Sequence, residues 1–129
     1  MLLEHISLLQ HLIDHVQTEK PEVIILDPLI RFISEDENSS VKMGQVFRRL
    51  RTLIDDFNIS LIIVDHTGKD SSKGARGSSV KRSEYDSAIY MHSKDNNSQL
   101  SFDMRHIETP DDKHIKFNSE TCWFENSEI

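Results

Sequence analysis

The amino-acid sequence predicts an α/β fold, with a mainly parallel sheet flanked by helices and antiparallel strands toward the C-terminus. Two short segments at 22–26 and 60–66, each with four consecutive branched apolar residues, are typical of buried parallel strands. A helical pattern at 41–57 separates them, so the three segments form a βαβ unit. Alternating, aromatic-rich segments after residue 87 predict the antiparallel part.

Two amphipathic helices are expected in the first half of the chain. The first is predicted at 2–17, where apolar residues recur at helical spacing, and Lys20-Pro21 ends it. The second runs from about Val41 to Phe57. Its apolar stripe consists of Met43, Val46, Phe47, Leu50, Leu53, Ile54 and Phe57. Because the strand at 22–26 is almost uniformly apolar, we expect both faces of the sheet to be covered.

The C-terminal part is expected to form three antiparallel strands, at 87–92, 99–106 and 114–124. Each alternates or carries aromatic residues, and polar turns separate them. We expect them to extend one edge of the parallel sheet, as antiparallel strands do in many mixed sheets. Cys122 is expected to pack in the core beside Trp123.

Length and composition limit the class of protein. A chain of 129 residues predicts one domain, residues 1–129. The net charge of −7 argues against a general nucleic-acid binder, so any such role needs a local basic patch. The single cysteine excludes an intrachain disulfide and fits a reducing compartment. With no signal-peptide pattern and no apolar run near ~18 residues, we expect a soluble cytoplasmic protein without membrane contact.

A carboxylate ends the first apolar strand, in VIILDPLIRF at 23–32. In an open α/β sheet, ligands bind beyond the carboxyl ends of the strands, where Asp27 and His66 both stand. Asp27 suits Mg²⁺, a hard cation that takes oxygen ligands. The alternative is that Asp27 only opens the Asp-Pro turn. His66 also has an alternative, a hydrogen-bonded core histidine.

The loop after the second strand is a basic island in an acidic chain. Between residues 67 and 82 it contains one acidic residue, Asp70. Its basic residues are Lys69, Lys73, Arg76, Lys81 and Arg82. Their clustering predicts phosphate contacts with single-stranded nucleic acid, where electrostatics supplies most of the affinity. The alternative is a solvated loop without a ligand.

Four segments resemble consecutive motifs of the RecA-like ATPases: VIILDPLIRF, IIVDHTGKD, ARGSS and SEYDSAIYM. The resemblance covers roughly residues 23–117 and is strongest to the branch with RepA-type hexameric replicative helicases and RadA/KaiC-like ATPases. It implies that Asp27 is the Walker B carboxylate that positions Mg²⁺, and that His66 senses the γ-phosphate of ATP. It also implies that Arg105 reaches the nucleotide of a neighbouring subunit, so that His66 and Arg105 are the catalytic candidates.

The phosphate-binding loop of that family is absent from this sequence. No G-x-x-x-x-G-K-[ST] pattern occurs, and the Gly68-Lys69-Asp70 run lacks both the first glycine and the Ser/Thr. The family's catalytic glutamate precedes Walker B in a stretch that these residues do not include. Pro28 follows Asp27, so no Asp-Glu pair replaces it. We therefore expect the C-terminal part of a RecA-like core, without its P-loop strand.

Two functions stay open on the sequence alone. The first is a truncated or split RecA-like ATPase of DNA replication or repair that uses Mg²⁺ and ATP. The second is a non-catalytic remnant that binds a partner ATPase or single-stranded nucleic acid. In the family, the P-loop strand lies between the strand ending near His66 and the strand at 87–92. Its absence predicts an open sheet edge, covered by a second copy, by a partner chain carrying the P-loop, or by a rearranged strand order.

Overall fold

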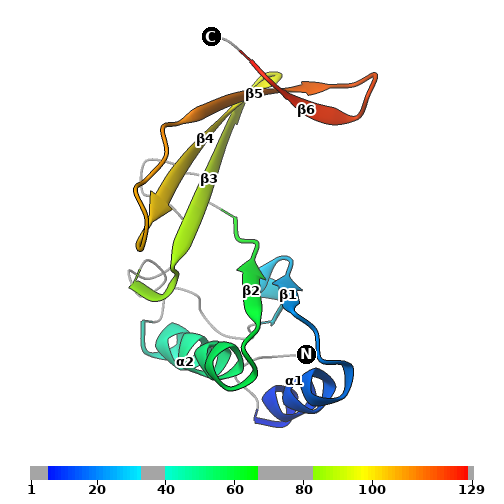
Figure 1. The fold of residues 1–129 in the computed structure, drawn as a ribbon, viewed down its shortest axis with the longest axis vertical. Coiled ribbons are helices and arrows are strands. Elements are labelled where there is room, and N and C mark those ends of the chain that lie inside the picture. Colours follow the sequence, from blue (N-terminus) through cyan, green and yellow to red (C-terminus); the bar gives the residue numbers. More distant parts are fainter. Residues whose placement is uncertain (1–5, 33–39, 67–82, 128–129) are drawn as a thin grey trace. The chain divides into compact units, whose positions relative to one another are not determined.

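The computed structural model describes residues 6–32, 40–66 and 83–127. By its internal contacts the chain divides into two compact units, Met1–Glu84 and Tyr85–Ile129. Each unit has a sheet of its own (Figure 1). The expectation that residues 1–129 form one domain stays a prediction.

The first unit is a parallel βαβ unit preceded by a helix. Its elements are α1 (Ile6–Glu19), β1 (Val23–Leu26), the 3-10 helix η1 (Leu29–Phe32), α2 (Ser40–Phe57) and β2 (Ser60–Ile63). β1 and β2 pair in parallel, as predicted. The second strand is shorter than the expected 60–66, because its regular pairing ends at Ile63.

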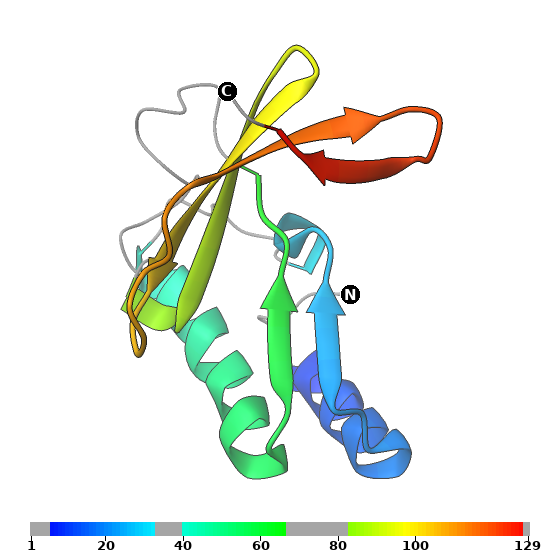
Figure 2. The same cartoon turned by 45° about the horizontal axis from the view of Figure 1, so that its top comes forward.

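The core of this unit lies between the two strands and the two helices. In the register of the sheet, Ile24 lies opposite Leu61 and Leu26 opposite Ile63, and these side chains pack against the helices. Both helices cover the same face of the strand pair (Figure 2). The buried side chains are Val16, Leu26, Leu29, Met43, Val46, Phe47, Leu50, Leu53 and Ile59.

The opposite face of the strand pair is exposed. Val23, Ile25 and Ile62 point to that face and are between 48% and 60% exposed. Within the first unit, α1 and α2 therefore both lie on one face, and no other described element of this unit lies on the second. The expectation that both faces of the sheet are covered stays a prediction.

The second unit is an antiparallel sheet of four strands in sequence order. The strands are β3 (Ser87–Lys94), β4 (Asn97–Met104), β5 (Lys113–Asn118) and β6 (Trp123–Asn126). Antiparallel C-terminal strands were predicted, but they form a sheet of their own and do not hydrogen-bond to β1 or β2. The fold is mixed α/β, and only the β1–β2 pairing is parallel among the described strands, so the expected mainly parallel sheet is not observed.

The strand expected at 114–124 is in fact a hairpin of β5 and β6. The side chain of Asn118 makes the turn, since its Oδ1 accepts the backbone N–H groups of Glu120 at 2.9 Å and Thr121 at 3.3 Å. Cys122 has a φ of 55° in this turn. Cys122 is exposed and Trp123 is 73% exposed, so the expected core packing of this pair is wrong.

Among the described helices, none combines the length and the apolar character needed to cross a lipid bilayer.

Candidate functional site

Asp27 is the first residue after β1. The backbone on both sides of Asp27 is hydrogen-bonded to Val64, the first residue after β2. The N–H of Val64 donates to the carbonyl of Leu26, and the N–H of Leu29 donates to the carbonyl of Val64, both at 2.9 Å. The Asp27-Pro28 peptide between these bonds is cis. Backbone pairing therefore continues past the regular end of the sheet. The exposed Asp27 carboxylate lies at the carboxyl ends of the two strands, where β2 also ends.

Asp65 and His66 follow the end of β2 at the same edge. The Oδ1 of Asp65 accepts the backbone N–H of His66 at 2.9 Å, and this bond shapes the chain as it leaves the sheet. The His66 side chain is exposed, whereas Asp65 is half-buried. The two strands are neighbours, as the sequence predicted, but the sensor role of His66 stays a prediction, as does the Walker B role of Asp27.

Asp65 is a candidate that the sequence reasoning missed. It follows an apolar run, as Asp27 does, so the same signal was present in IIVDH. The resemblance to the RecA-like ATPases matched the next residue, His66, to the γ-phosphate sensor, and Asp65 was therefore passed over. In the structure β2 ends at Ile63, so Asp65 is nearer to the strand end than His66.

These residues fit part of a Mg²⁺–nucleotide site. The described residues contain no group of three or more His, Cys, Asp or Glu side chains able to enclose a metal. Mg²⁺ does not need such a cage, because it keeps several waters and binds through one or two carboxylates plus phosphate oxygens. Asp27, together with Asp65, can supply those carboxylates. The P-loop, which would bind the phosphates of a nucleotide at such a site, does not occur in the sequence.

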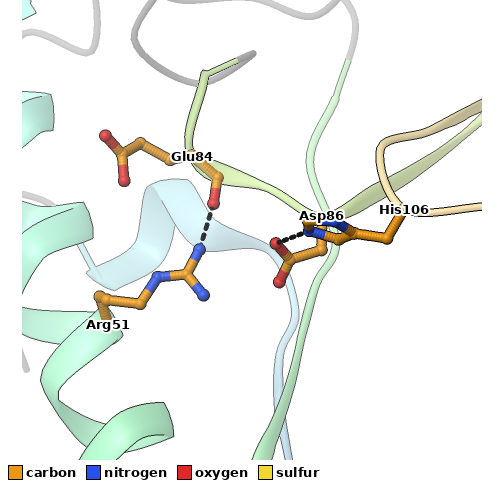
Figure 3. Close-up of polar contacts among 4 residues, drawn as sticks. All are labelled: Arg51, Glu84, Asp86 and His106. Atoms are coloured by element: carbon orange, nitrogen blue, oxygen red, sulfur yellow. Dashed lines mark hydrogen bonds and ion pairs between the residues drawn. The ribbon is translucent and has the colours of Figure 1, made fainter.

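Arg105 lies in the second unit, directly after β4. Its backbone N–H donates to the carbonyl of Asp86 at 2.9 Å. The carboxylate of Asp86 also faces the ring of His106, with 3.3 Å between Oδ1 and Nε2 (Figure 3). Asp86 thus holds the turn that carries Arg105. Because Asp27 belongs to the other unit, the proposed action of Arg105 on a nucleotide stays a prediction.

Arg51 makes a long-range contact that the sequence did not indicate. Its Nη2 donates to the carbonyl of Glu84 at 2.7 Å, in a partly buried position (Figure 3). The bond ties α2 to the last residue of the first unit. The side chains of the predicted basic loop, Lys69, Lys73, Arg76, Lys81 and Arg82, lie outside the described residues.

A parallel βαβ unit presents side chains beyond the carboxyl ends of its strands, where open α/β sheets bind ligands. The model of the AAA domain family matches residues 5–72, which is more than half of the chain. The chain therefore belongs to the AAA domain family, whose members are ATPases of the P-loop type that in general use ATP and Mg²⁺. The matched range includes β1, α2 and β2 with Asp27, Asp65 and His66, and it ends before β3.

Proposed function

We propose that the first unit is the Walker B and sensor half of a RecA-like ATPase of DNA replication or repair, and that a polypeptide carrying a P-loop completes it. The observation that carries this proposal is the register of β1 and β2. Leu26 and Ile63 lie opposite each other at the strand ends, so Asp27 and the Asp65–His66 pair leave the sheet at one edge. The family match over 5–72 supports the same half-site.

Each side chain has a distinct role in this proposal. Asp27 holds Mg²⁺ through its carboxylate, directly or through water, and Asp65 adds negative charge at the same edge. Mg²⁺ bound there would neutralise the charge of the phosphates. His66 donates a hydrogen bond to the γ-phosphate from its exposed imidazole. Arg105 acts on the nucleotide of a neighbouring subunit.

The outer edge of β2 is the proposed contact with the P-loop polypeptide. Among the described strands, β2 pairs only with β1, and it does not pair with β3. An open parallel edge exposes backbone N–H and C=O groups that a further strand can pair with. The exposed face formed by Val23, Ile25 and Ile62 lies beside this edge and would pack under a helix of the same polypeptide.

The sequence also supports an alternative, a non-catalytic module that binds a partner ATPase or single-stranded DNA. The specific observation in its favour is the missing P-loop. Without that loop, the site beside Asp27 lacks the backbone N–H groups and the lysine that hold the phosphates in this family. In this alternative the β2 edge still binds a partner, but Asp27 and His66 take no part in hydrolysis.

The two proposals are separated by ATP turnover in a mixture. The reading frame next to this one should encode a protein with G-x-x-x-x-G-K-[ST], and we expect the mixture of both chains to hydrolyse ATP. Asp27→Asn should abolish that turnover, whereas Asp103→Asn, on the second unit, should leave it unchanged. If a P-loop partner binds this chain and the mixture hydrolyses ATP at the same rate with Asp27→Asn, the non-catalytic module is supported. The lack of any such partner would also favour that module.

A further inference from the structure

We infer that the sheet of the second unit packs face to face against the same sheet of a second copy of this chain. The pairing register assigns every strand residue to one of two faces, because directly opposed residues share a face and neighbours alternate. One face, called the apolar face below, gathers most of the large hydrophobic side chains. It consists of Ile89, Met91, Leu100, Phe102, Met104, Ile115, Phe117 and Phe124.

The opposite face of the sheet is polar. It carries the alternate residues of the same strands, including His92, Gln99 and His114, which lie in one row across three strands. The acidic residues of the strands, Asp103 and Glu125, are on this polar face as well. The sheet is therefore amphipathic, the arrangement typical of a sheet with one buried face and one solvated face.

Within the second unit, the apolar face has no second layer, because the described helices and strands of this unit are the four strands of one sheet. All the buried hydrophobic side chains of the described chain lie between residues 16 and 59, in the first unit. The apolar face instead shows four large side chains, Ile89, Met91, Phe117 and Phe124, that are 37–63% exposed. A sheet with one hydrophobic face is stable only when that face is buried against another layer. We therefore expect another protein surface to pack on the apolar face.

A second copy suits this face by shape and by charge. Two sheets that pack face to face form a sandwich with a layer spacing of ~10 Å, and a two-fold axis lets one surface be its own partner. The chain has a net charge of −7, which opposes self-association in general. On the apolar face, however, Lys113 is the only charged strand residue, so the repelling carboxylates stay outside the contact.

The available area matches a small specific interface. A fully buried aromatic side chain covers ~150–250 Å², so the four exposed side chains, with the half-buried ones beside them, offer roughly 500 Å² per copy. Two copies would bury about 1,000 Å² in total, the size at which specific interfaces begin. A dimer of this size is expected to be concentration-dependent.

The test is the mass of the full chain in solution by light scattering or sedimentation over a range of about 1–200 µM. We expect the mass to rise toward that of a dimer, and Phe124→Lys to return it to the monomer. Trp123→Lys is the matched control, because Trp123 precedes Phe124 on β6, is more exposed, and lies on the polar face. A strictly monomeric wild type, or equal loss with both variants, would overturn the proposal.

Further variants separate this interface from other ways of dimerising. Ile89→Lys lies on β3, at the other end of the sheet, and should also give a monomer. Association through the open edge of β3 would survive Phe124→Lys, and association through the first unit would be lost in Ile62→Lys instead; either result contradicts the proposal. Circular dichroism identifies variants that unfold, and Met91→Lys then replaces Ile89→Lys. Asp27→Asn should not alter the mass, since the interface is independent of the proposed ATPase site.

Discussion

Leu26 and Ile63 lie opposite each other, and each is the last residue of its strand in the parallel pair β1–β2. Two carboxylates, Asp27 and Asp65, therefore follow at the same edge of the sheet. In α/β proteins this edge is where ligands bind. In the proposed function these two carboxylates form half of an ATPase site, in a chain whose sequence contains no P-loop.

The isolated chain is expected to hydrolyse no ATP above background. Hydrolysis needs ATP held beside the Mg²⁺ ion, and the P-loop that holds the nucleotide phosphates in this family does not occur in the sequence. A phosphate-release assay on the purified chain measures this. Asp27→Ala should give the same background rate. Steady turnover that Asp27→Ala abolishes would mean that other residues replace the missing lysine and glutamate.

The basic loop is expected to give weak, salt-sensitive binding of single-stranded DNA. Each phosphate contact contributes a slope of ~0.7 to the fall of log K with log salt, so Lys73→Ala/Arg76→Ala should lower the slope by about 1.4. Fluorescence anisotropy of a labelled oligonucleotide measures both affinity and slope. Lys94→Ala/Lys113→Ala, which removes equal charge from the second unit, is the control. Binding that persists at high salt would remove the loop from consideration.

Leu53→Ala is expected to destabilise the first unit by ~2–5 kcal/mol, the range for emptying a fully buried leucine site. Leu53 on α2 is fully buried in the core between helices and strands. Val41→Ala on the same helix should change the free energy of unfolding by less than about 0.5 kcal/mol, because Val41 is 70% exposed. Urea denaturation monitored by circular dichroism compares the two. Similar losses for both variants would contradict the observed packing of α2.

Arg51→Met is expected to loosen the chain at Glu84 without unfolding α2. The variant keeps the aliphatic stem but removes the guanidinium that donates to the Glu84 carbonyl at 2.7 Å. A hydrogen bond from a charged group contributes ~1.5–3 kcal/mol, so amide exchange near residues 84–85 should accelerate at least several-fold. In Arg48→Met the lost bond is to the Gly44 carbonyl within α2, and exchange at 84–85 should not change. Equal exchange in both variants would show that Arg51 does not hold this segment.

The first unit could be predicted from the sequence because its local patterns agree with its packing. The apolar stripe from Met43 to Phe57 has a helical period, and α2 spans nearly the expected residues. The parallel pairing of β1 and β2 followed from the helix between them. Which faces are covered could not be predicted, since apolar runs imply cover on both sides but contain no information on where α1 packs.

The second unit was harder to predict because its turns depend on single side chains. The bonds that Asn118 Oδ1 accepts divide β5 from β6, and Asn118-Ser119, a turn signal, stands inside an aromatic-rich run whose pattern predicts a single strand. The contacts of Arg51 with Glu84 and of His106 with Asp86 join residues far apart in sequence, so no spacing rule indicates them. Asp27, in contrast, could be selected from the sequence, since a carboxylate that ends an apolar strand is a local signal.

The most direct test of the half-site is a titration of the isotope-labelled chain with Mn²⁺, a paramagnetic substitute for Mg²⁺, observed by NMR. We predict that the amide signals of Asp27, Leu29 and Asp65 broaden first, because two carboxylates follow neighbouring strands there. This broadening should be lost in Asp27→Asn and kept in Asp56→Asn, which removes an exposed carboxylate from α2. Broadening that is equal at all exposed carboxylates, or unchanged in Asp27→Asn, would contradict the account.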